Sequence, residues 1–393
     1  MKRNSRKIIR AVTVSQSIGF CREVMIKMRE RGYEMIVVTS KGRELDELRD
    51  VDGFRCLEVE MERHISPIKD FVALMKMISV FWRERPQMVH SMTPKAGLLC
   101  MMAAWLTRVP VRIHTFTGLV WPTEEGMKRR VLMFTDWLTC ACATHVIPEG
   151  RGVMDDLKKG GITHKPMKVL GYGNVMGIDL ERFCGKGIVV NRVKRGGKCR
   201  NFLFVGRIVG DKGINELVRA VVRLHDVLPD VKLRLVGNYE WNLDPLDSDT
   251  MKVIEDEIRK DESVRFIDVC GGKYGDDLIC EYKWADCFVM PSYREGFPNT
   301  VIEAGAMDLP CVVTDINGSR EIIEDGVNGL IVAPKDENGL FDAMKRMAED
   351  DELRYKMVQN ARTMIASRFE KNFVQGRLME FYQTILPKES RLS

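Results

Sequence analysis

Short apolar runs separated by longer amphipathic stretches recur along the whole chain. Runs of about four to eight apolar residues between helical stretches are typical of parallel strands that helices cover on both faces. In the first half these runs are 7–14, 35–39, 55–60, 88–91, 111–116, 145–148 and 169–172. In the second half they are 201–205, 231–236, 264–266, 287–290, 310–314 and 326–332. The alternation predicts an α/β chain built from doubly wound parallel sheets.

The length of 393 residues exceeds that of one ordinary domain, so two domains are expected. We predict a first Rossmann-like domain over 1–183 and a second over 201–370. Between them, a linker over 184–200 gathers glycines and basic residues. A last helix begins near 371 and belongs to a closing segment, 371–393.

The stretch 286–332 carries the clearest candidate chemistry, because it reads as strand, loop, helix and strand. Its loop opens at the carboxyl end of a strand, where open α/β sheets bind ligands. Glu295 lies in this loop, and Glu303 is predicted in the first turn of the helix that follows. Free N–H groups at a helix start suit phosphate, and carboxylates accept hydrogen bonds from sugar hydroxyls. The alternative is a capping box formed by Thr300 and Glu303, with Glu295 a solvated loop acid.

A second loop of the same kind follows the predicted strand 201–205. It contains Gly206, Arg207 and Lys212 before the next helix. A strand end, a glycine and a helix start form an anion cradle. Arginine grips phosphate with a fork of donors and lysine adds a point charge. The alternative is that both cations are simply solvated.

The run Glu295-Gly296-Phe297-Pro298, with Glu303 after seven intervening residues, resembles the donor-nucleotide motif of family 4 retaining glycosyltransferases. That resemblance implies the GT-B fold, in which two Rossmann-like domains face a cleft. It implies that Glu295 contacts the donor sugar and Glu303 the nucleotide ribose.

The same resemblance assigns roles to several main-chain and loop groups. The N–H groups of Asn299, Thr300 and Val301 would face the donor diphosphate. Gly206, Arg207 and Lys212 match the Gly-Arg…Lys-Gly arrangement whose cations hold that diphosphate and stabilise the leaving group without metal. By the same resemblance, Gly19 matches the glycine in the first loop of the acceptor-side domain and is counted among the donor-binding residues.

In the first half, the most informative loop is Thr117-Gly118, after the strand 111–116. Many family members carry a histidine where this chain has Thr117, and the nearest histidine, His114, lies three residues earlier. Retaining transfer in this fold is thought to use front-face attack with the leaving diphosphate as base. The histidine is then helpful rather than obligatory, and Thr117 joins Arg207, Lys212 and Glu295 among the predicted catalytic residues.

Gly118, His90 and Lys95 are the acceptor-side candidates, since the last two lie at a strand end and a helix start. His90 is equally consistent with a packed core histidine. The turn 173–179 resembles the family's junction between domains, and the last helix would return to the first domain. The resemblance covers nearly the whole chain and is strongest in its second half.

The net charge of +5 is unevenly distributed. Residues 1–190 hold 31 Lys and Arg against 21 Asp and Glu, and residues 191–393 hold 30 against 35. A basic first half favours an anionic partner, such as a membrane surface or a diphosphate, or else reflects a solvated surface. A nucleic-acid partner is not expected, because no nucleic-acid motif occurs. The helix predicted at 124–143 starts with basic residues near Trp121, so it either rests on a membrane or covers the sheet.

Eleven scattered cysteines without a C-x-x-C pair predict reduced thiols and a cytoplasmic protein. The basic amino terminus lacks a cleavage site typical of a signal peptide, and the longest apolar stretch is too short to span a bilayer. Asp247-Ser248-Asp249 is a D-x-D without strand context, so we interpret Asp249 as a helix cap and expect no metal and no cofactor.

The resemblance to family 4, taken with these patterns, implies a metal-independent, retaining glycosyltransferase. It would move a hexose or N-acetylhexosamine from a nucleotide-sugar, a UDP-sugar above all, to a lipid-diphosphate-linked sugar or a growing surface polysaccharide. Peripheral contact with the inner face of the membrane would accompany this acceptor. Two alternatives stay open. One is another GT-B reaction, such as a nucleotide-sugar epimerase or a phosphorylase. The other is a non-catalytic nucleotide-sugar-binding partner subunit.

Overall fold

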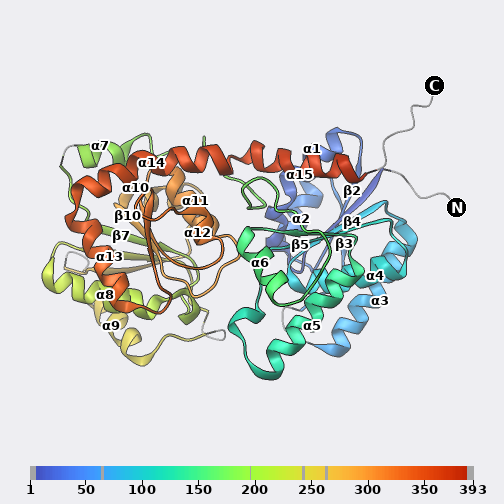
Figure 1. Cartoon of the computed structure of the whole chain (residues 1–393), viewed down its shortest axis with the longest axis horizontal. Helices are drawn as coiled ribbons and strands as arrows, with labels where there is room; N and C mark the ends of the chain where they lie inside the picture. The colour runs from blue at the N-terminus through green and yellow to red at the C-terminus, as the bar shows by residue number, and fades with distance from the viewer. Residues whose placement is uncertain (1–5, 63–65, 195, 241–243, 262–263, 387–393) are drawn as a thin grey trace. The chain divides into compact units, whose positions relative to one another are not determined.

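The computed structural model describes residues 6–62, 66–194, 196–240, 244–261 and 264–386. The ends of the first predicted domain and of the closing segment, 1–5 and 387–393, therefore lie outside the described residues. The chain divides into two compact units: unit 1 is Met1–Gly177 with Asn372–Ser393, and unit 2 is Ile178–Lys371. Each holds one parallel six-stranded sheet (Figure 1), so the predicted pair of doubly wound α/β sheets is confirmed.

The sheet of unit 1 has the order β3-β2-β1-β4-β5-β6. Its strands are β1 Lys7–Ala11, β2 Glu34–Thr39, β3 Arg55–Glu58, β4 Met88–Met92, β5 Val111–Phe116 and β6 His145–Pro148. Its helices are η1 Ser15–Phe20, α1 Arg22–Glu30, α2 Arg43–Asp50, α3 Pro67–Glu84, α4 Pro94–Leu106, η2 Trp121–Thr123, α5 Gly126–Cys142, α6 Arg151–Lys159 and α15 Lys371–Ile385, whose first residue belongs to unit 2.

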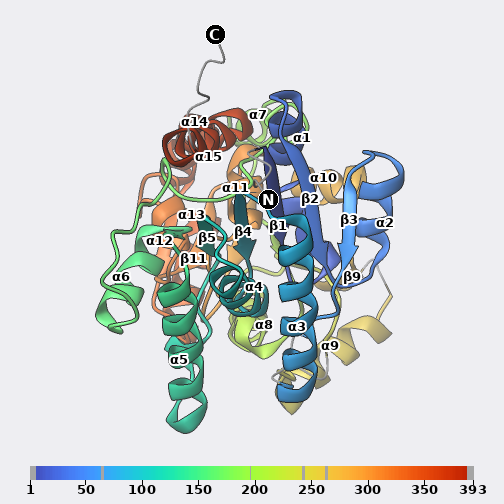
Figure 2. The same ribbon diagram turned by 90° about the vertical axis from the view of Figure 1, so that its right-hand side faces the viewer.

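Alternating residues of the unit 1 strands enter two separate cores, as the period of two in a strand requires. Ile9 and Ala11 face a core shared with α3, α4, α5 and α6. Ile8 faces a second core shared with α1, α2 and α15. Figure 2 shows α3, α4 and α5 side by side on one face of this sheet. The sheet is therefore covered on both faces, which explains its continuous apolar strands.

The sheet of unit 2 has the order β12-β11-β10-β7-β8-β9. Its strands are β7 Asn201–Val205, β8 Lys232–Val236, β9 Ile267–Gly271, β10 Cys287–Met290, β11 Cys311–Thr314 and β12 Gly329–Val332. Its helices are α7 Ile188–Lys194, η3 Gly210–Lys212, α8 Ile214–Val227, α9 Ser248–Arg259, α10 Gly275–Trp284, α11 Asn299–Ala306, α12 Ser319–Ile322, α13 Glu337–Glu349 and α14 Asp351–Phe369. One continuous apolar core joins the strands to helices on both faces.

Three local predictions are wrong. Residues 169–172 form no strand, because Gly171 and Gly173 turn the chain with φ of 60° and 99°, and only Met167 bridges to β6. The strand predicted at 264–266 begins instead at Ile267. The cap of α9 is Asp247, whose side chain accepts a hydrogen bond from the Thr250 N–H at 2.8 Å; Asp249 lies inside the first turn. The stretch 184–200 contains α7, and its role as a linker stays a prediction.

Two absences concern only the part of the chain that the structure describes. Within it, no helix has the length and apolar composition needed to cross a membrane. Within it, too, no group of three or more His, Cys, Asp or Glu side chains is placed to hold a metal ion.

Gly213 allows the loop after β7 to approach the loop after β10 closely. It precedes α8 with φ of 70°, a left-handed conformation that glycine adopts without strain. A Cβ atom on Gly213 would lie 2.1 Å from the Pro291 carbonyl oxygen, in the loop after β10. Main chain thus packs directly on main chain at this point.

We expect Gly213→Ala to lower the stability of the protein by about 2 kcal/mol more than Gly271→Ala does. Gly271 is a matched control, because its φ is 66° but no atom lies within 4 Å of the position its Cβ would take. The difference therefore isolates the clash with Pro291 from backbone strain. Calorimetric unfolding of both variants measures it, and equal shifts in Tm would contradict this account of Gly213.

Candidate functional site

The candidate site of unit 2 lies at the point where its strand order reverses. β7 and β10 are neighbours, yet the chain runs from β7 toward β8 on one side and from β10 toward β11 on the other. The loops that leave the carboxyl ends of such a strand pair diverge and open a crevice, the usual ligand site of doubly wound sheets. These loops are 206–213 and 291–298, the two that the sequence analysis selected.

An ion pair joins the two loops. Lys212 Nζ lies 2.5 Å from Glu295 Oε1, and the side chains expose only 13% and 19% of their area. The Ser292 hydroxyl donates a second hydrogen bond to the same carboxylate oxygen, at 3.0 Å. An ammonium carries three donors, so its bond to Glu295 orients it without exhausting it. The structure therefore brings together two predicted site residues that lie 83 positions apart in the sequence.

Further contacts hold the loop after β10 in place, and sequence reasoning missed them. The Tyr293 hydroxyl donates to Glu216 Oε1 at 2.8 Å, and its main-chain N–H donates to the Asp211 carbonyl at 2.9 Å. Arg294 Nη2 lies 3.0 Å from Asp211 Oδ2. These partners lie far away in the sequence and follow no motif, so only the folded chain reveals them. They make the carboxylate of Glu295 a fixed feature of the crevice.

Arg207 follows Gly206 directly after β7 and is held less firmly than Lys212. Its Nη1 atom lies 3.3 Å from Glu240 Oε2, and the two side chains expose 40% and 35% of their area. Exposed ion pairs contribute little to stability, so this guanidinium can exchange Glu240 for an anionic ligand at small cost. The two predicted cations thus differ, because the Lys212 ammonium is held in place and the Arg207 guanidinium can change its partner.

Gly296, Phe297 and Pro298 shape the loop rather than presenting side chains to the crevice. Phe297 is buried and meets Phe369 edge to face, with ring centroids 5.4 Å apart. Gly318, with φ of 76°, packs against this turn so closely that its Cβ would lie 2.5 Å from the Gly296 carbonyl oxygen. The packing of this loop thus depends on the buried ring of Phe297 and on a glycine at position 318.

The helix after this loop begins at Asn299, with Pro298 as the preceding residue and no side-chain cap. Asn299 and Thr300 are partly exposed, whereas Val301 is buried and its N–H donates to the Pro298 carbonyl at 3.2 Å. The first turn therefore presents polar main chain at Asn299 and Thr300, while the Val301 N–H already serves the turn itself.

Glu303 lies in the second turn of α11, not in the first, so its predicted position and the capping-box alternative are both wrong. Pro298 occupies the cap position and Thr300 is already the second helical residue, so Thr300 cannot be the cap. The Tyr282 hydroxyl on α10 instead donates to Glu303 Oε2 at 2.7 Å. Burial raises the pKa of Glu303 to about 7, and the hydrogen bond from Tyr282 and the charge of Arg182 only partly oppose this. This carboxyl group therefore exchanges its proton near neutral pH.

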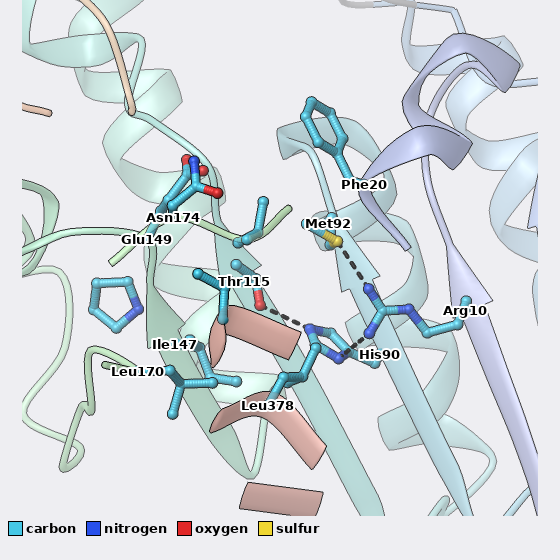
Figure 3. Close-up of a pocket in the computed structure, with 13 residues that line it drawn as sticks. Arg10, Phe20, His90, Met92, Thr115, Ile147, Glu149, Leu170, Asn174 and Leu378 are labelled. Atoms are coloured by element: carbon cyan, nitrogen blue, oxygen red, sulfur yellow. Dashed lines mark hydrogen bonds between the residues drawn. The ribbon is translucent and has the colours of Figure 1, made fainter. Parts of the chain in front are cut away.

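Unit 1 contains a pocket on the sheet face that α15 covers (Figure 3). Arg10 from β1, His90 from β4 and Thr115 from β5 place polar groups where neighbouring strand positions are apolar. Phe20, Glu149, Leu170, Asn174 and Leu378 are among the other lining residues.

Hydrogen bonds connect Arg10, His90 and Thr115, which we call the polar row of unit 1. Arg10 donates to His90 Nδ1 and to the Tyr382 hydroxyl of α15, and its Nη2 lies 2.9 Å from the sulfur of Met92. Because Nδ1 accepts from Arg10, the His90 proton sits on Nε2, which donates to Thr115 Oγ1 at 2.7 Å. Burial, followed by the charge of Arg10, holds the pKa of His90 well below its usual value. His90 is thus a neutral histidine of the core that also borders the pocket.

The remaining predicted residues of unit 1 lie apart from this row. Lys95 Nζ donates to both carboxylate oxygens of Asp70 at 2.6 Å, which ties the start of α4 to α3. Thr117 follows β5 directly and is half-buried, and Gly118 has φ of 124°. Gly19 lies in η1, with no atom within 4 Å of the position its Cβ would take. Gly19 was predicted among the donor-binding residues, but it lies in unit 1, whereas the others lie in unit 2.

Thr93 is a residue that sequence reasoning missed. It lies between β4 and α4, beside the strand-order reversal of unit 1, and adopts φ of 70°. Its hydroxyl accepts a hydrogen bond from the Thr13 N–H at 3.0 Å, which ties the loop after β1 to the loop after β4. Strained conformations of β-branched residues cluster at functional sites, and no sequence signal marks this one.

Comparison with known proteins identifies relatives along the whole chain. The family model described as glycosyl transferases group 1 matches residues 191–364, and the glycosyl transferase 4-like domain matches residues 20–173. The capsular polysaccharide biosynthesis glycosyltransferase CapM of Staphylococcus aureus is 32% identical over 98% of this chain and 99% of its own length. An Escherichia coli protein named UDP-Gal:alpha-D-GlcNAc-diphosphoundecaprenol alpha-1,3-galactosyltransferase is 27% identical over 78% of each chain.

Among solved structures, Anabaena Alr3699/HepE in complex with UDP-glucose superposes with a TM-score of 0.75. The match covers 96% of this chain and 99% of that one at 18% identity, so it bears on the fold alone. The predicted GT-B architecture is confirmed.

Glu303 predicts a specific dependence of stability on pH. Its native pKa lies above the ordinary value of 4.5, so the folded protein holds a proton that the unfolded chain has released. Stability is then fully present below that ordinary value and falls as the pH rises toward about 7. We expect Glu303→Gln to remove this loss of stability. The free energy of unfolding of the variant minus that of the native protein should therefore be about 2 kcal/mol larger at about pH 8 than at about pH 5.

Urea unfolding at the two pH values measures this difference without any ligand. Glu352→Gln serves as the control, because Glu352 is an exposed carboxylate on α14. Unfolding curves of the native protein and of Glu303→Gln that shift in parallel with pH would show that Glu303 does not hold the proton.

Proposed function

Because this chain belongs to the group 1 glycosyltransferases, a retaining family of enzymes, we propose that it takes its sugar from a UDP-sugar and passes it to a lipid-linked or polysaccharide acceptor. The sugar transferred is a hexose or an N-acetylhexosamine. The donor occupies the crevice beside β7 and β10 of unit 2. The observation that carries this proposal is the ion pair of Lys212 with Glu295, which puts a fixed cation and a fixed carboxylate at that crevice.

Each charged group of unit 2 suits one part of such a donor. The diphosphate lies against Lys212 and Arg207, since ammonium and guanidinium groups form the strong, charge-assisted bonds that phosphate accepts. Asn299 and Thr300 lie beside it at the start of α11. Glu295 accepts hydrogen bonds from the donor sugar, and Glu303 accepts them from the ribose. A bound ribose favours the charged form of Glu303, so nucleotide binding displaces the proton that the empty site holds.

The reaction proceeds on one face of the donor sugar. The bond between the anomeric carbon and the diphosphate oxygen breaks while the acceptor hydroxyl forms a new bond to that carbon from the same side. The leaving diphosphate takes the acceptor's proton, and the cations Arg207 and Lys212 stabilise the charge that develops on it. Thr117 takes the place of the histidine found in many relatives. Because the diphosphate serves as the base, this change removes a contact but not the acid–base step.

The names of two relatives support a lipid-linked acceptor. The Escherichia coli relative is named for UDP-Gal and a diphosphoundecaprenol-linked sugar. A Campylobacter jejuni relative, 24% identical over 94% of this chain, is named for a diphospho-undecaprenol-linked sugar as well. The basic balance of residues 1–190 suits an acceptor that carries a diphosphate. We propose that the protein acts in the cytoplasm at the inner face of the membrane, without a metal ion.

Calorimetric titration with UDP and GDP in the presence of a chelator tests the donor site. We expect UDP to bind without metal, and Lys212→Met and Glu303→Ala each to weaken binding about tenfold or more. Lys356→Met, an exposed lysine on α14, is the control and should bind as the native protein does. Preference for GDP would change the nucleotide of the proposed donor from UDP to GDP and leave the proposed site unchanged. Failure of both nucleotides to bind would overturn the proposal.

A further inference from the structure

Helix α3 is apolar on two opposite faces, and only one of them is buried. Ala73, Met77 and Phe81 enter the core of unit 1. The opposite face carries an apolar stripe in which every side chain exposes 48% or more of its area: Ile68, Phe71, Val72, Met75 and Trp82. A helix that is apolar all round is normally buried all round, so this stripe lacks a covering surface among the described residues.

Basic side chains run beside the stripe in a regular row. Lys69, Lys76 and Arg83 are spaced seven residues apart, so they lie along one edge of the helix. All three are exposed, and Lys69 also pairs with Glu62. A stripe of apolar groups flanked by a row of cations is the pattern of a helix that lies in the interface of an anionic membrane.

Helix α5 repeats this pattern. Its exposed apolar side chains, Met127, Val131, Phe134 and Trp137, recur at helical spacing along one face. The rings of the last two stack with centroids 5.7 Å apart and an interplanar angle of 25°. Near its start α5 carries three consecutive cations, Lys128, Arg129 and Arg130, all exposed, with Lys128 paired to Glu124.

Helix α4 lies between α3 and α5 and contacts both, so the three helices form one layer (Figure 2). Trp105 and Leu106 at the end of α4 are also exposed. Beside them the ends of α3 and α4 line a hollow of about 490 Å³ that includes Arg85 and Arg108. Of the nineteen large apolar side chains exposed in the described residues, eleven belong to these three helices. The concentration marks one interaction surface rather than scattered exposure.

We propose that this layer, the outer face of α3, α4 and α5, docks on a membrane that contains anionic lipids. Three exposed tryptophans suit the headgroup level, the apolar stripes suit the acyl boundary, and the cations suit anionic headgroups. Cations beside exposed apolar groups on both outer helices favour anionic lipid over an apolar protein surface. The inference rests on the proposed function, because a protein that uses a lipid-linked acceptor must reach that acceptor at a membrane surface. It also extends the membrane contact from α5, where the sequence suggested it, to α3.

Co-sedimentation with vesicles tests the proposal on the full chain. We expect the protein to bind vesicles of phosphatidylcholine with about a third phosphatidylglycerol, and to bind pure phosphatidylcholine about tenfold less. Two variants should each weaken binding to the anionic vesicles about tenfold. One removes the stripe: Phe71→Gln, Met75→Gln and Trp82→Gln. The other reverses the row: Lys69→Glu, Lys76→Glu and Arg83→Glu.

Matched controls come from exposed residues of unit 2 and should bind as the native protein does. The apolar control is Val227→Gln, Ile258→Gln and Tyr274→Gln, and the charge control is Lys252→Glu, Arg346→Glu and Lys356→Glu. Equal vesicle binding by the stripe variant and its control would overturn the proposal. So would a native dimer in light scattering that the stripe variant abolishes, since the surface would then join two copies.

Titration of the same samples with UDP separates this proposal from the proposed function. The stripe and row variants should bind UDP as the native protein does, because all six residues belong to unit 1 and the proposed donor site to unit 2. Normal UDP binding without vesicle binding by the native protein would refute the docking surface alone. Vesicle binding without UDP binding would refute the donor site alone.

Discussion

The contact between the loops after β7 and β10 is the constraint on which the proposed donor site depends. Lys212 and Glu295 come from different βα units, and their pairing at 2.5 Å requires the two loops to approach without side chains between them. Gly213 permits that approach, since its Cα faces the Pro291 carbonyl. A partly buried ion pair stabilises the fold only with good geometry and further hydrogen bonds, such as the one that Ser292 donates to Glu295. The hydrogen bond from Tyr293 to Glu216 anchors the loop that carries this carboxylate.

Sequence reasoning recovered the architecture because it depends on local patterns. Apolar runs of strand length alternate with helices, and each buried strand keeps that pattern whatever its partners. The positions of Arg207, Lys212 and Glu295 followed from their place at strand ends. Boundaries were wrong where a glycine or an exposed residue ended a run, as at Gly171.

The rest of the site could not be predicted because it depends on partners distant in the sequence. Glu303 differs from a solvated acid because it is buried, and its hydrogen-bond partner Tyr282 lies 21 positions earlier on another helix. The role of His90 depends on Arg10 and on Tyr382, 292 positions later. A charged residue inside the apolar run of β1 was a visible anomaly, but nothing in the sequence named its partners. Helix α3 has two apolar faces, and periodicity alone cannot tell which of them the fold covers.

The central claim is that this chain transfers a sugar from a UDP-sugar to an acceptor with retention at the anomeric carbon. Its most direct test is NMR spectroscopy of the product formed from a panel of UDP-sugars and a synthetic lipid-diphosphate-linked sugar. The account predicts UDP release only when the acceptor is present, and a new linkage with the anomeric configuration of the donor. A product of inverted configuration would contradict it, and so would release of UDP and free sugar that is indifferent to the acceptor.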